Sequence, residues 1–445
     1  MTQYEKMTKT PIPGLIVRLS IPTIIAMMVT NIYNLVDTAF VGTLGTSQSG
    51  AVGIVFGFMS ILQACGFLFG QGSGSILSRR LGARDEAEAS VIASTGFFTA
   101  FLSAVVIGII SYLLLDPLVI FLGSTETIAP YAETYIRCII CVAPFMVTTF
   151  TLNNLLRFEG RAFYGMIGLM TGAVLNIGGD ALFMFVFDMG ILGAGLSTAI
   201  SQVISFCVLL IPFFRGKTQC RLSIRKVRWG GGRIGDIFAV GFPSLIRQGL
   251  QAIATILLNS EAGVFGDAAV AGMSIVSRIF MFIFSVSIGV GQGFQPVSGF
   301  NYGAKKYSRL RQGFRFTWLF SEVLVVILAG LVFAFSGSLV ALFRDDPEVI
   351  EIATRALRLQ CGAVIFLPFT MVTEMCLQST GQKLSAAFMS SLRSGLIFIP
   401  LLLIMSRLRG LMGIEEAQPL TYVLVFIPAI FVAIHFFRRL PDQDG

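Results

Sequence analysis

The sequence predicts an all-α integral membrane protein with about 12 transmembrane helices in two parallel six-helix repeats. Of its 445 residues, 55% are hydrophobic and only 13% are charged, roughly half the charged share of an ordinary globular domain. The mean hydropathy is +0.82. The apolar residues form long continuous runs, whereas a membrane β-barrel would require alternating segments of about 10 residues. Short motifs also recur at one constant spacing, which indicates a duplicated chain.

The predicted transmembrane helices follow from run length, because a helix needs about 20 mostly apolar residues to cross a bilayer. Runs of this kind in the first half cover residues 14–40, 49–77, 88–115, 128–156, 163–187 and 191–214. Those in the second half cover residues 234–262, 270–298, 310–337, 349–377, 384–406 and 415–437. The first run follows a polar start without a small-residue cleavage site, so we expect it to remain as an anchor.

The orientation follows from basic residues, which gather in alternate connecting segments. Examples are Arg79 and Arg80, the segment 215–233, and Lys305 and Lys306. Because short cytoplasmic loops are enriched in Lys and Arg, both termini are predicted to be cytoplasmic, in a multi-pass protein of a prokaryotic plasma (inner) membrane. The same bias accounts for the net charge of +8, so no nucleic-acid partner is expected.

The duplication is visible in motifs that recur at one constant difference in residue number, the repeat offset. Gly70-Gln-Gly72 returns as Gly291-Gln-Gly293, and the same offset relates Pro22 to Pro243. The predicted domains are a cytoplasmic tail (1–13), an N-lobe (14–214), a basic cytoplasmic linker (215–233), a C-lobe (234–437) and a second tail (438–445). With six helices each, both lobes start on the same side. Parallel repeats of this kind occur in transporters whose halves rock around a central cavity; duplication retained only for packing is the alternative.

Two acids fall inside predicted helices of the N-lobe. Ionisable residues within the membrane are costly and are therefore functional candidates. Asp37 lies about 23 residues into the first helix and Asp180 about 17 residues into the fifth, which runs the same way, so both reach a similar depth. Tyr33 and Asn34 can share the helix face of Asp37, and Asn176 that of Asp180. Such a pair could exchange a proton, coordinate Na⁺ with the nearby oxygens, or only join helices by hydrogen bonds.

The C-lobe carries charges of both signs within its predicted helices. Arg247 and Gln251 form a polar stripe, and a buried arginine needs a partner, which Glu322 or Glu374 could supply. A structural ion pair is favoured over a substrate contact. The candidates for a substrate site or polar cavity in this lobe are Gln251, Arg247, Gln248, Glu374, Glu322 and Arg278.

Several kinds of chemistry are not expected from this sequence. The one histidine, His435, lies among basic residues at the end of the last helix, and no metal-ligand spacing is present. Gly70-Gln-Gly-Ser-Gly74 lacks the Lys-Ser/Thr of a nucleotide-binding loop. We therefore expect no catalytic residues, no enzyme activity, no metal site and no cofactor beyond a coupling ion, H⁺ or Na⁺, so that any transport is secondary.

The sequence resembles one family of transporters across residues 14–437. The stretch from Ile32 to Gly42 (IYNLVDTAFVG), the stretch from Gly291 to Pro296 (GQGFQP) and the following Asn301 to Lys305 (NYGAK) are similar to motifs of the multidrug and toxic compound extrusion (MATE) family. The resemblance implies two lobes around a central cavity, and export of organic cations in exchange for H⁺ or Na⁺. The same superfamily contains flippases for lipid-linked oligosaccharides.

The resemblance also assigns residues to the N-lobe site. In the DinF-like branch, two acids are accompanied by Tyr, Asn and Thr, which implies Asp37, Asp180, Tyr33, Asn176, Tyr135 and Thr198 here. NorM-like members carry further acids in helices 7 and 10. This chain has Gln251 at the first of those positions and no acid at the second, so it is more DinF-like than NorM-like.

The function expected from these observations is a secondary antiporter that exports organic cations or drugs in exchange for H⁺, or alternatively Na⁺. The two lobes would rock as the N-lobe carboxylates take up and release protons. A flippase or exporter of a lipid-linked precursor is the alternative, since Arg247, Arg278 and Arg393 could bind a pyrophosphate. The expected partners are small cationic or amphipathic substrates and the lipid bilayer. A duplicated chain can form its cavity as a monomer.

Overall fold

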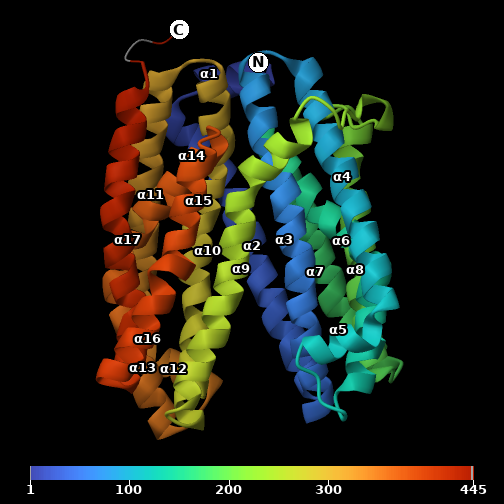
Figure 1. Cartoon of the computed structure of the whole chain (residues 1–445), viewed down its shortest axis with the longest axis vertical. Helices are drawn as coiled ribbons and strands as arrows, with labels where there is room; N and C mark the ends of the chain where they lie inside the picture. The colour runs from blue at the N-terminus through green and yellow to red at the C-terminus, as the bar shows by residue number, and fades with distance from the viewer. Residues whose placement is uncertain (1, 442–443, 445) are drawn as a thin grey trace. The chain divides into compact units, whose positions relative to one another are not determined.

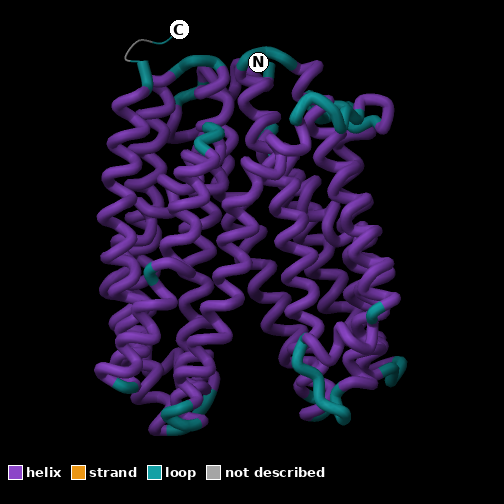
Figure 2. Tube along the Cα trace, in the orientation of Figure 1, coloured by secondary structure: helices purple, strands orange, loops and turns teal. Residues whose placement is uncertain are grey.

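The computed structural model describes residues 2–441 and residue 444, and within these it contains helices and no strand (Figures 1 and 2). Twelve of the described helical segments are long and apolar enough to cross a membrane, which confirms the predicted fold class. Each predicted apolar run lies within or largely overlaps one of these segments.

The helices of the first half are α1 (Gln3–Lys9), α2 (Ile12–Gly42), α3 (Thr46–Gly82), α4 (Glu86–Leu113), α5 (Leu115–Phe121), α6 (Ala129–Phe158), α7 (Ala162–Asp180), the π-helical η1 (Ala181–Val186) and α8 (Gly190–Phe214). A 3-10 turn, η2 (Ile224–Lys226), lies in the connection to the second half. The second half comprises α9 (Arg233–Gly263), α10 (Asp267–Gly303), α11 (Tyr307–Ala334), α12 (Ser336–Phe343), α13 (Pro347–Ala363), the 3-10 turn η3 (Val364–Phe366), α14 (Leu367–Ser379), α15 (Lys383–Ser391), the π-helical η4 (Leu392–Leu396), α16 (Phe398–Arg409) and α17 (Leu411–Arg439).

The duplication extends to the helix boundaries. The repeat offset that relates Pro22 to Pro243 also relates the first residues of α2, α3, α4, α7 and α8 to those of α9, α10, α11, α15 and α17. The turns repeat as well: Gly45 and Gly266 have φ of 126° and 102°, and Arg84 and Lys305 have φ of 61° and 56°. Left-handed backbone is costly for a residue with a side chain. Its recurrence at Arg84 and Lys305 therefore shows that the two halves share the same turn geometry.

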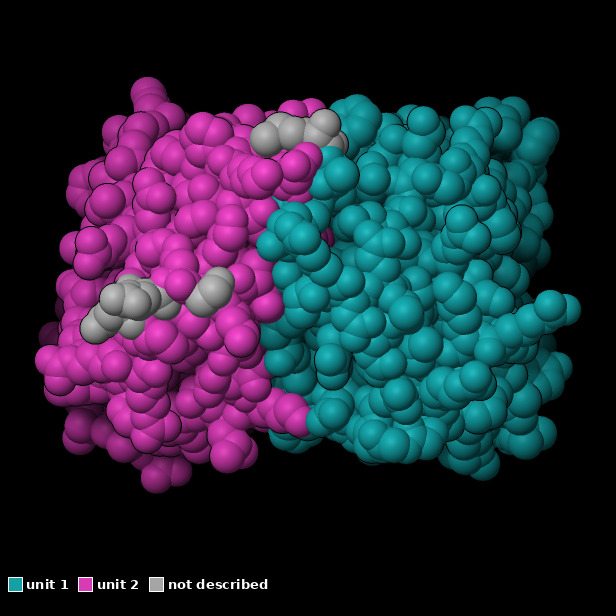
Figure 3. All heavy atoms as spheres, turned by 90° about the horizontal axis from the view of Figure 1, so that it is seen from above, with its two compact units in different colours: residues 1–4, 25–245 teal, residues 5–24, 246–445 magenta. Residues whose placement is uncertain are grey.

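The chain forms two compact units, coloured separately in Figure 3. Of the described residues, unit 1 contains 2–4 and 25–245, and unit 2 contains 5–24, 246–441 and 444. The starts of α2 and α9 are therefore exchanged between the halves, and the repeat offset relates the two crossover points as well. Glycine permits this packing: a Cβ on Gly72 of α3 would clash with the carbonyl oxygen of Ile237 in α9, and one on Gly293 of α10 would clash with Ser20 in α2.

Residues 215–233, which connect α8 to α9, are bound along α4 within unit 1. The Ser94 hydroxyl donates to the Arg221 carbonyl (3.2 Å) and accepts from the Ser223 N–H (3.1 Å). The Arg228 N–H donates to the Thr95 hydroxyl at 3.1 Å. Side-chain hydroxyls of α4 thus satisfy backbone groups that would otherwise need a neighbouring strand or water, and they hold this linker in one conformation.

Glu159, in the turn between α6 and α7, also binds the linker backbone. Its side chain is 0% exposed, and its carboxylate accepts hydrogen bonds from the backbone N–H groups of Gln219 (3.1 Å) and Cys220 (3.0 Å). Burial raises the pKa of Glu159 to about 7, against the opposing effect of these N–H groups and of Arg161. Glu159 could not be predicted from the sequence, because no local pattern indicates that a carboxylate in a turn is buried.

We expect Glu159 to make folding stability fall as the pH rises. Between about pH 4.5 and 7 the carboxyl group is ionised in the unfolded chain but protonated in the folded one, so the folded state loses about 3 kcal/mol of relative stability over that window. Glu159→Gln stays neutral and keeps an acceptor oxygen. Thermal unfolding in detergent between pH 5 and 8 should show a smaller decline for E159Q than for the wild type. Parallel pH profiles would contradict this assignment.

Candidate functional site

The two predicted acids of the first half come together inside unit 1. Asp37 lies in α2 and is partly buried, and Asp180 is the last residue of α7 and is 0% exposed. Their carboxyl groups are close enough to interact electrostatically. Two acids held together in a membrane-spanning bundle are costly unless a proton or a cation accompanies them.

Polar side chains of four further residues surround the acids. The Tyr135 and Thr198 hydroxyl oxygens are 3.3 Å apart, and the Asn176 amide donates to the Thr198 oxygen at 3.2 Å. Tyr33 and Tyr135 both lie within electrostatic reach of both carboxylates. Six of the seven predicted residues therefore form one cluster. Asn34 makes no hydrogen bond to the other six within the described residues.

Four buried oxygens of this cluster accept no hydrogen bond from the described part of the protein: Asp37 Oδ1, both Asp180 Oδ atoms and Asn176 Oδ1. Buried acceptors are normally paired, so this group is suited to receive a proton or a small cation. A cavity of about 30 Å³ adjoins Tyr33, Asn176 and Thr198, which is large enough to hold a water molecule. Carboxylate, amide and hydroxyl oxygens are hard ligands, which suit H⁺ or Na⁺ better than a transition metal.

Close packing of α7 on α8 positions the cluster. A Cβ on Gly179 would lie 2.5 Å from the Ser197 hydroxyl, and that hydroxyl donates to the Asn176 carbonyl at 2.9 Å. Immediately after Asp180 the helix widens into the π-helical η1, a feature that often accompanies functional sites. Ser197 was not predicted from the sequence, and neither was Gln202, which also lines the small cavity. The four-residue spacing of polar residues in α8 was the available signal.

Unit 2 contains a different buried cluster, centred on Glu374 in α14. Arg247 Nη1 lies 2.7 Å from Glu374 Oε1, Arg393 Nη1 lies 3.5 Å from Oε2, and the Ser390 hydroxyl donates to Oε1 at 2.6 Å. Glu374 is 1% exposed and Arg393 4%. The predicted ion pair of Arg247 is confirmed, with Glu374 as its partner and not Glu322. Two arginines share one carboxylate, so the cluster carries one excess positive charge.

The other second-half candidates lie outside this cluster. Gln251 is exposed, and its side-chain oxygen accepts from the Ser394 hydroxyl at 2.9 Å, next to Arg393. Glu322 and Gln248 are partly buried and Arg278 is exposed. Among the described residues, none of these three pairs with Arg247, Glu374 or Arg393.

Twelve membrane-spanning helices in two repeated halves, with ionisable groups buried inside each half, define a polytopic membrane transporter. The profile of the MatE family matches residues 22–182 and 243–404, one stretch in each repeat. The chain belongs to that family.

Similar proteins cover nearly the whole chain. It is 27% identical over 422 residues to "Multidrug export protein MepA" of Staphylococcus saprophyticus, covering 95% of this chain and 93% of the relative. The corresponding protein of Staphylococcus aureus is 27% identical over 433 residues, with coverage of 97% and 96%. Among solved structures, an outward-facing "multidrug resistance MATE family transporter of the MOP superfamily" superimposes with a TM-score of 0.94, at 25% identity and full coverage of both chains.

Proposed function

We propose that this protein is a secondary antiporter that exports organic cations across the plasma membrane in exchange for H⁺, with Asp37 and Asp180 as the coupling site. The observation that carries the proposal is the set of buried, unpartnered oxygens around these two acids. The names of the relatives, which are multidrug export proteins, support the class of cargo. The proposal includes no catalytic residues.

Coupling follows from the two protonation states of the acid pair. When one carboxyl group holds a proton, it can donate to the other, which removes the repulsion and satisfies acceptors. When both are ionised, the site attracts a cation. The same site therefore favours either a proton or a cationic substrate, and rocking of the halves would exchange the two across the membrane. If one proton enters for each monovalent organic cation that leaves, no net charge crosses the membrane. The pH gradient then drives export and contributes about 1.4 kcal/mol, or a tenfold gradient of the cation, per pH unit.

The proposed orientation places both termini in the cytoplasm. Within unit 2, a single basic segment contacts both ends of the chain: the Asn301 amide donates to the Met7 carbonyl at 3.2 Å, and Arg311 donates to the Leu440 carbonyl at 3.1 Å. Lys305 and Lys306 lie in the same segment, which the positive-inside rule assigns to the cytoplasmic side.

The direct test is efflux of ethidium from proteoliposomes that contain the purified protein. A pH gradient and an Na⁺ gradient are imposed separately, at matched membrane potential. We expect the pH gradient to drive efflux. Efflux driven only by Na⁺ would keep the antiporter and change its ion. If neither gradient moves any member of a broad panel of organic cations, the proposal is wrong and a lipid-linked precursor becomes the cargo to examine.

A further inference from the structure

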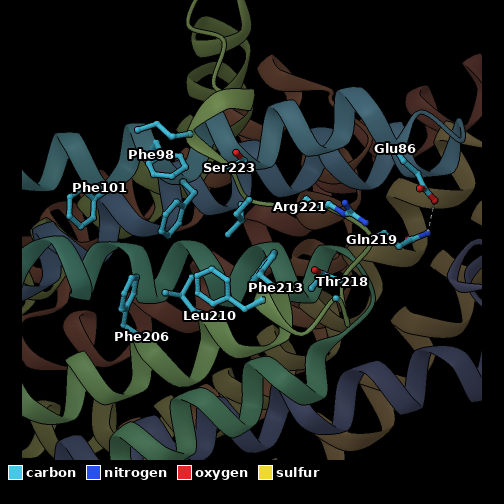
Figure 4. Close-up of a pocket in the computed structure, with 15 residues that line it drawn as sticks. Glu86, Phe98, Phe101, Phe206, Leu210, Phe213, Thr218, Gln219, Arg221 and Ser223 are labelled. Carbon is cyan, nitrogen blue, oxygen red and sulfur yellow. Dashed lines mark hydrogen bonds between the residues drawn. The ribbon is translucent and has the colours of Figure 1, made fainter.

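A second cavity in unit 1 lies apart from the coupling site. It is a half-open groove with a volume of about 980 Å³, lined by residues of α4, α8 and the linker (Figure 4). No member of the acid cluster lines it. Its volume is at the upper end of the roughly 300–1,000 Å³ found for small-molecule sites, so it has room for a substantial ligand.

The two ends of this groove differ in chemistry. At one end, phenylalanines of α4 and α8 form the walls, with Phe97 and Phe206 stacked at a centroid distance of 6.4 Å. At the other end, Thr218, Gln219 and Arg221 of the linker line it, as Figure 4 shows. The apolar end belongs to membrane-spanning helices and the polar end to the segment that follows them. A ligand that fits both ends must have an apolar chain and a polar head.

The length of the groove matches one leaflet. Along α4, the lining residues extend from Glu86 to Phe101, which is about 22 Å of helix at 1.5 Å per residue. Half of the hydrocarbon core of a bilayer is about 15 Å thick. The groove therefore reaches from the level of the lipid headgroups well into the acyl chains.

The linker that forms the polar end of the groove is strongly basic. Residues 215–233 contain seven basic and no acidic residues, and the exposed Arg221 lines the groove. Glu86 is the acid among the lining residues, and its carboxylate accepts from the Gln219 amide at 3.3 Å. A basic segment at the membrane surface attracts anionic lipid headgroups and disfavours a cationic drug.

The polar end is also held in place before any ligand arrives. The Arg221 N–H donates to the Ser90 hydroxyl (3.3 Å), and the Arg221 carbonyl accepts from Ser94 (3.2 Å). The Glu159 carboxylate accepts hydrogen bonds from the N–H groups of the two preceding residues, Gln219 and Cys220. A ligand therefore does not need to order the linker, which lowers the cost of binding. Substitution of the Arg221 side chain leaves these backbone contacts intact.

We propose that the groove between α4, α8 and the linker binds one anionic glycerophospholipid. An acyl chain lies along the phenylalanines and the phosphate lies at Arg221. The bound lipid fills the gap between α4 and α8 and joins the linker to the membrane surface.

The test is native mass spectrometry of the full, delipidated chain, titrated with phosphatidylglycerol or with phosphatidylcholine of the same acyl chains. Arg221→Gln is compared with Arg225→Gln, which removes the same charge from an exposed residue of the same linker that does not line the groove. We expect the wild type to bind the first phosphatidylglycerol more tightly than phosphatidylcholine. R221Q should weaken that step about tenfold, the effect of losing one charge-assisted hydrogen bond to the phosphate. R225Q should weaken it clearly less, since Arg225 adds only to the general surface charge.

A groove-filling variant, Leu210→Trp, should weaken binding of both lipids. Equal effects of R221Q and R225Q on phosphatidylglycerol would show attraction to general surface charge and overturn the proposal. So would equal affinity of the wild type for the two lipids, or displacement of the bound lipid by ethidium, which would assign the groove to cargo.

Discussion

Asp180→Asn is expected to reduce pH-driven efflux of organic cations to the rate of empty liposomes. The amide has the shape of the carboxyl group but does not titrate, so the site loses the exchange of proton and cation. Its NH₂ group can donate to the unpartnered Asn176 oxygen, so the fold should be retained. Asp37→Asn should have the same effect, because the two carboxyl groups act as a pair. The measurement is ethidium efflux at several imposed pH gradients.

Asp188→Asn provides the matched control. Asp188 is an exposed residue eight positions after Asp180, and the substitution is chemically the same. Its backbone φ is 52°, a left-handed value that asparagine also adopts readily. D188N should transport like the wild type. Normal coupled efflux in D180N, together with a lowered unfolding temperature, would instead show that Asp180 only joins helices.

Glu374→Leu is expected to lower folding stability by about 3–5 kcal/mol, the usual cost of leaving a buried charge without its partner. Glu374 is the carboxylate shared by Arg247 and Arg393 in unit 2, and its loss leaves two cations in an apolar interior. We expect little monodisperse protein after purification, and a markedly lower thermal unfolding midpoint in detergent.

The triple variant Arg247→Met, Glu374→Leu, Arg393→Met removes all three charges and should recover most of the loss, since apolar residues of similar size often replace buried ion groups at little cost. Glu322→Leu is the control, because this partly buried acid of α11 forms no ion pair within the described residues. If E374L and E322L had equal effects, the cluster would contribute nothing specific. A triple variant less stable than E374L would show that the charges are needed for packing.

The two halves share a fold, but their buried charged residues are not repeated. The repeat offset places Leu258 and Leu401 at the positions that correspond to Asp37 and Asp180, and Gly172 at the position that corresponds to Arg393. Unit 1 therefore holds the pair of neighbouring acids, and unit 2 holds the cluster in which two arginines share one carboxylate. This asymmetry is consistent with ion coupling in one half only. Asp180→Asn tests the buried acids of unit 1, and Glu374→Leu tests the buried charges of unit 2.

The number of membrane-spanning helices and the repeat could be predicted from the sequence alone, and so could Asp37 and Asp180 as candidate site residues. Hydropathy over about 20 residues is a local property, and it decides whether a helix can span the hydrocarbon core of the bilayer. The repeat offset stays constant because insertions and deletions between the corresponding helix starts cancel or are absent. A carboxylate inside such a run is conspicuous in any sequence.

Which of these residues contact one another could be seen only in the folded structure. Glu374 and not Glu322 pairs with Arg247, although the ion pair joins residues 127 positions apart. Ser197 contacts Asn176 only because glycine lets α7 approach α8. Glu159 is buried only because the linker folds over it. Each of these outcomes depends on the packing of helices that are distant in the chain, and periodicity within one helix carries no information about its neighbours.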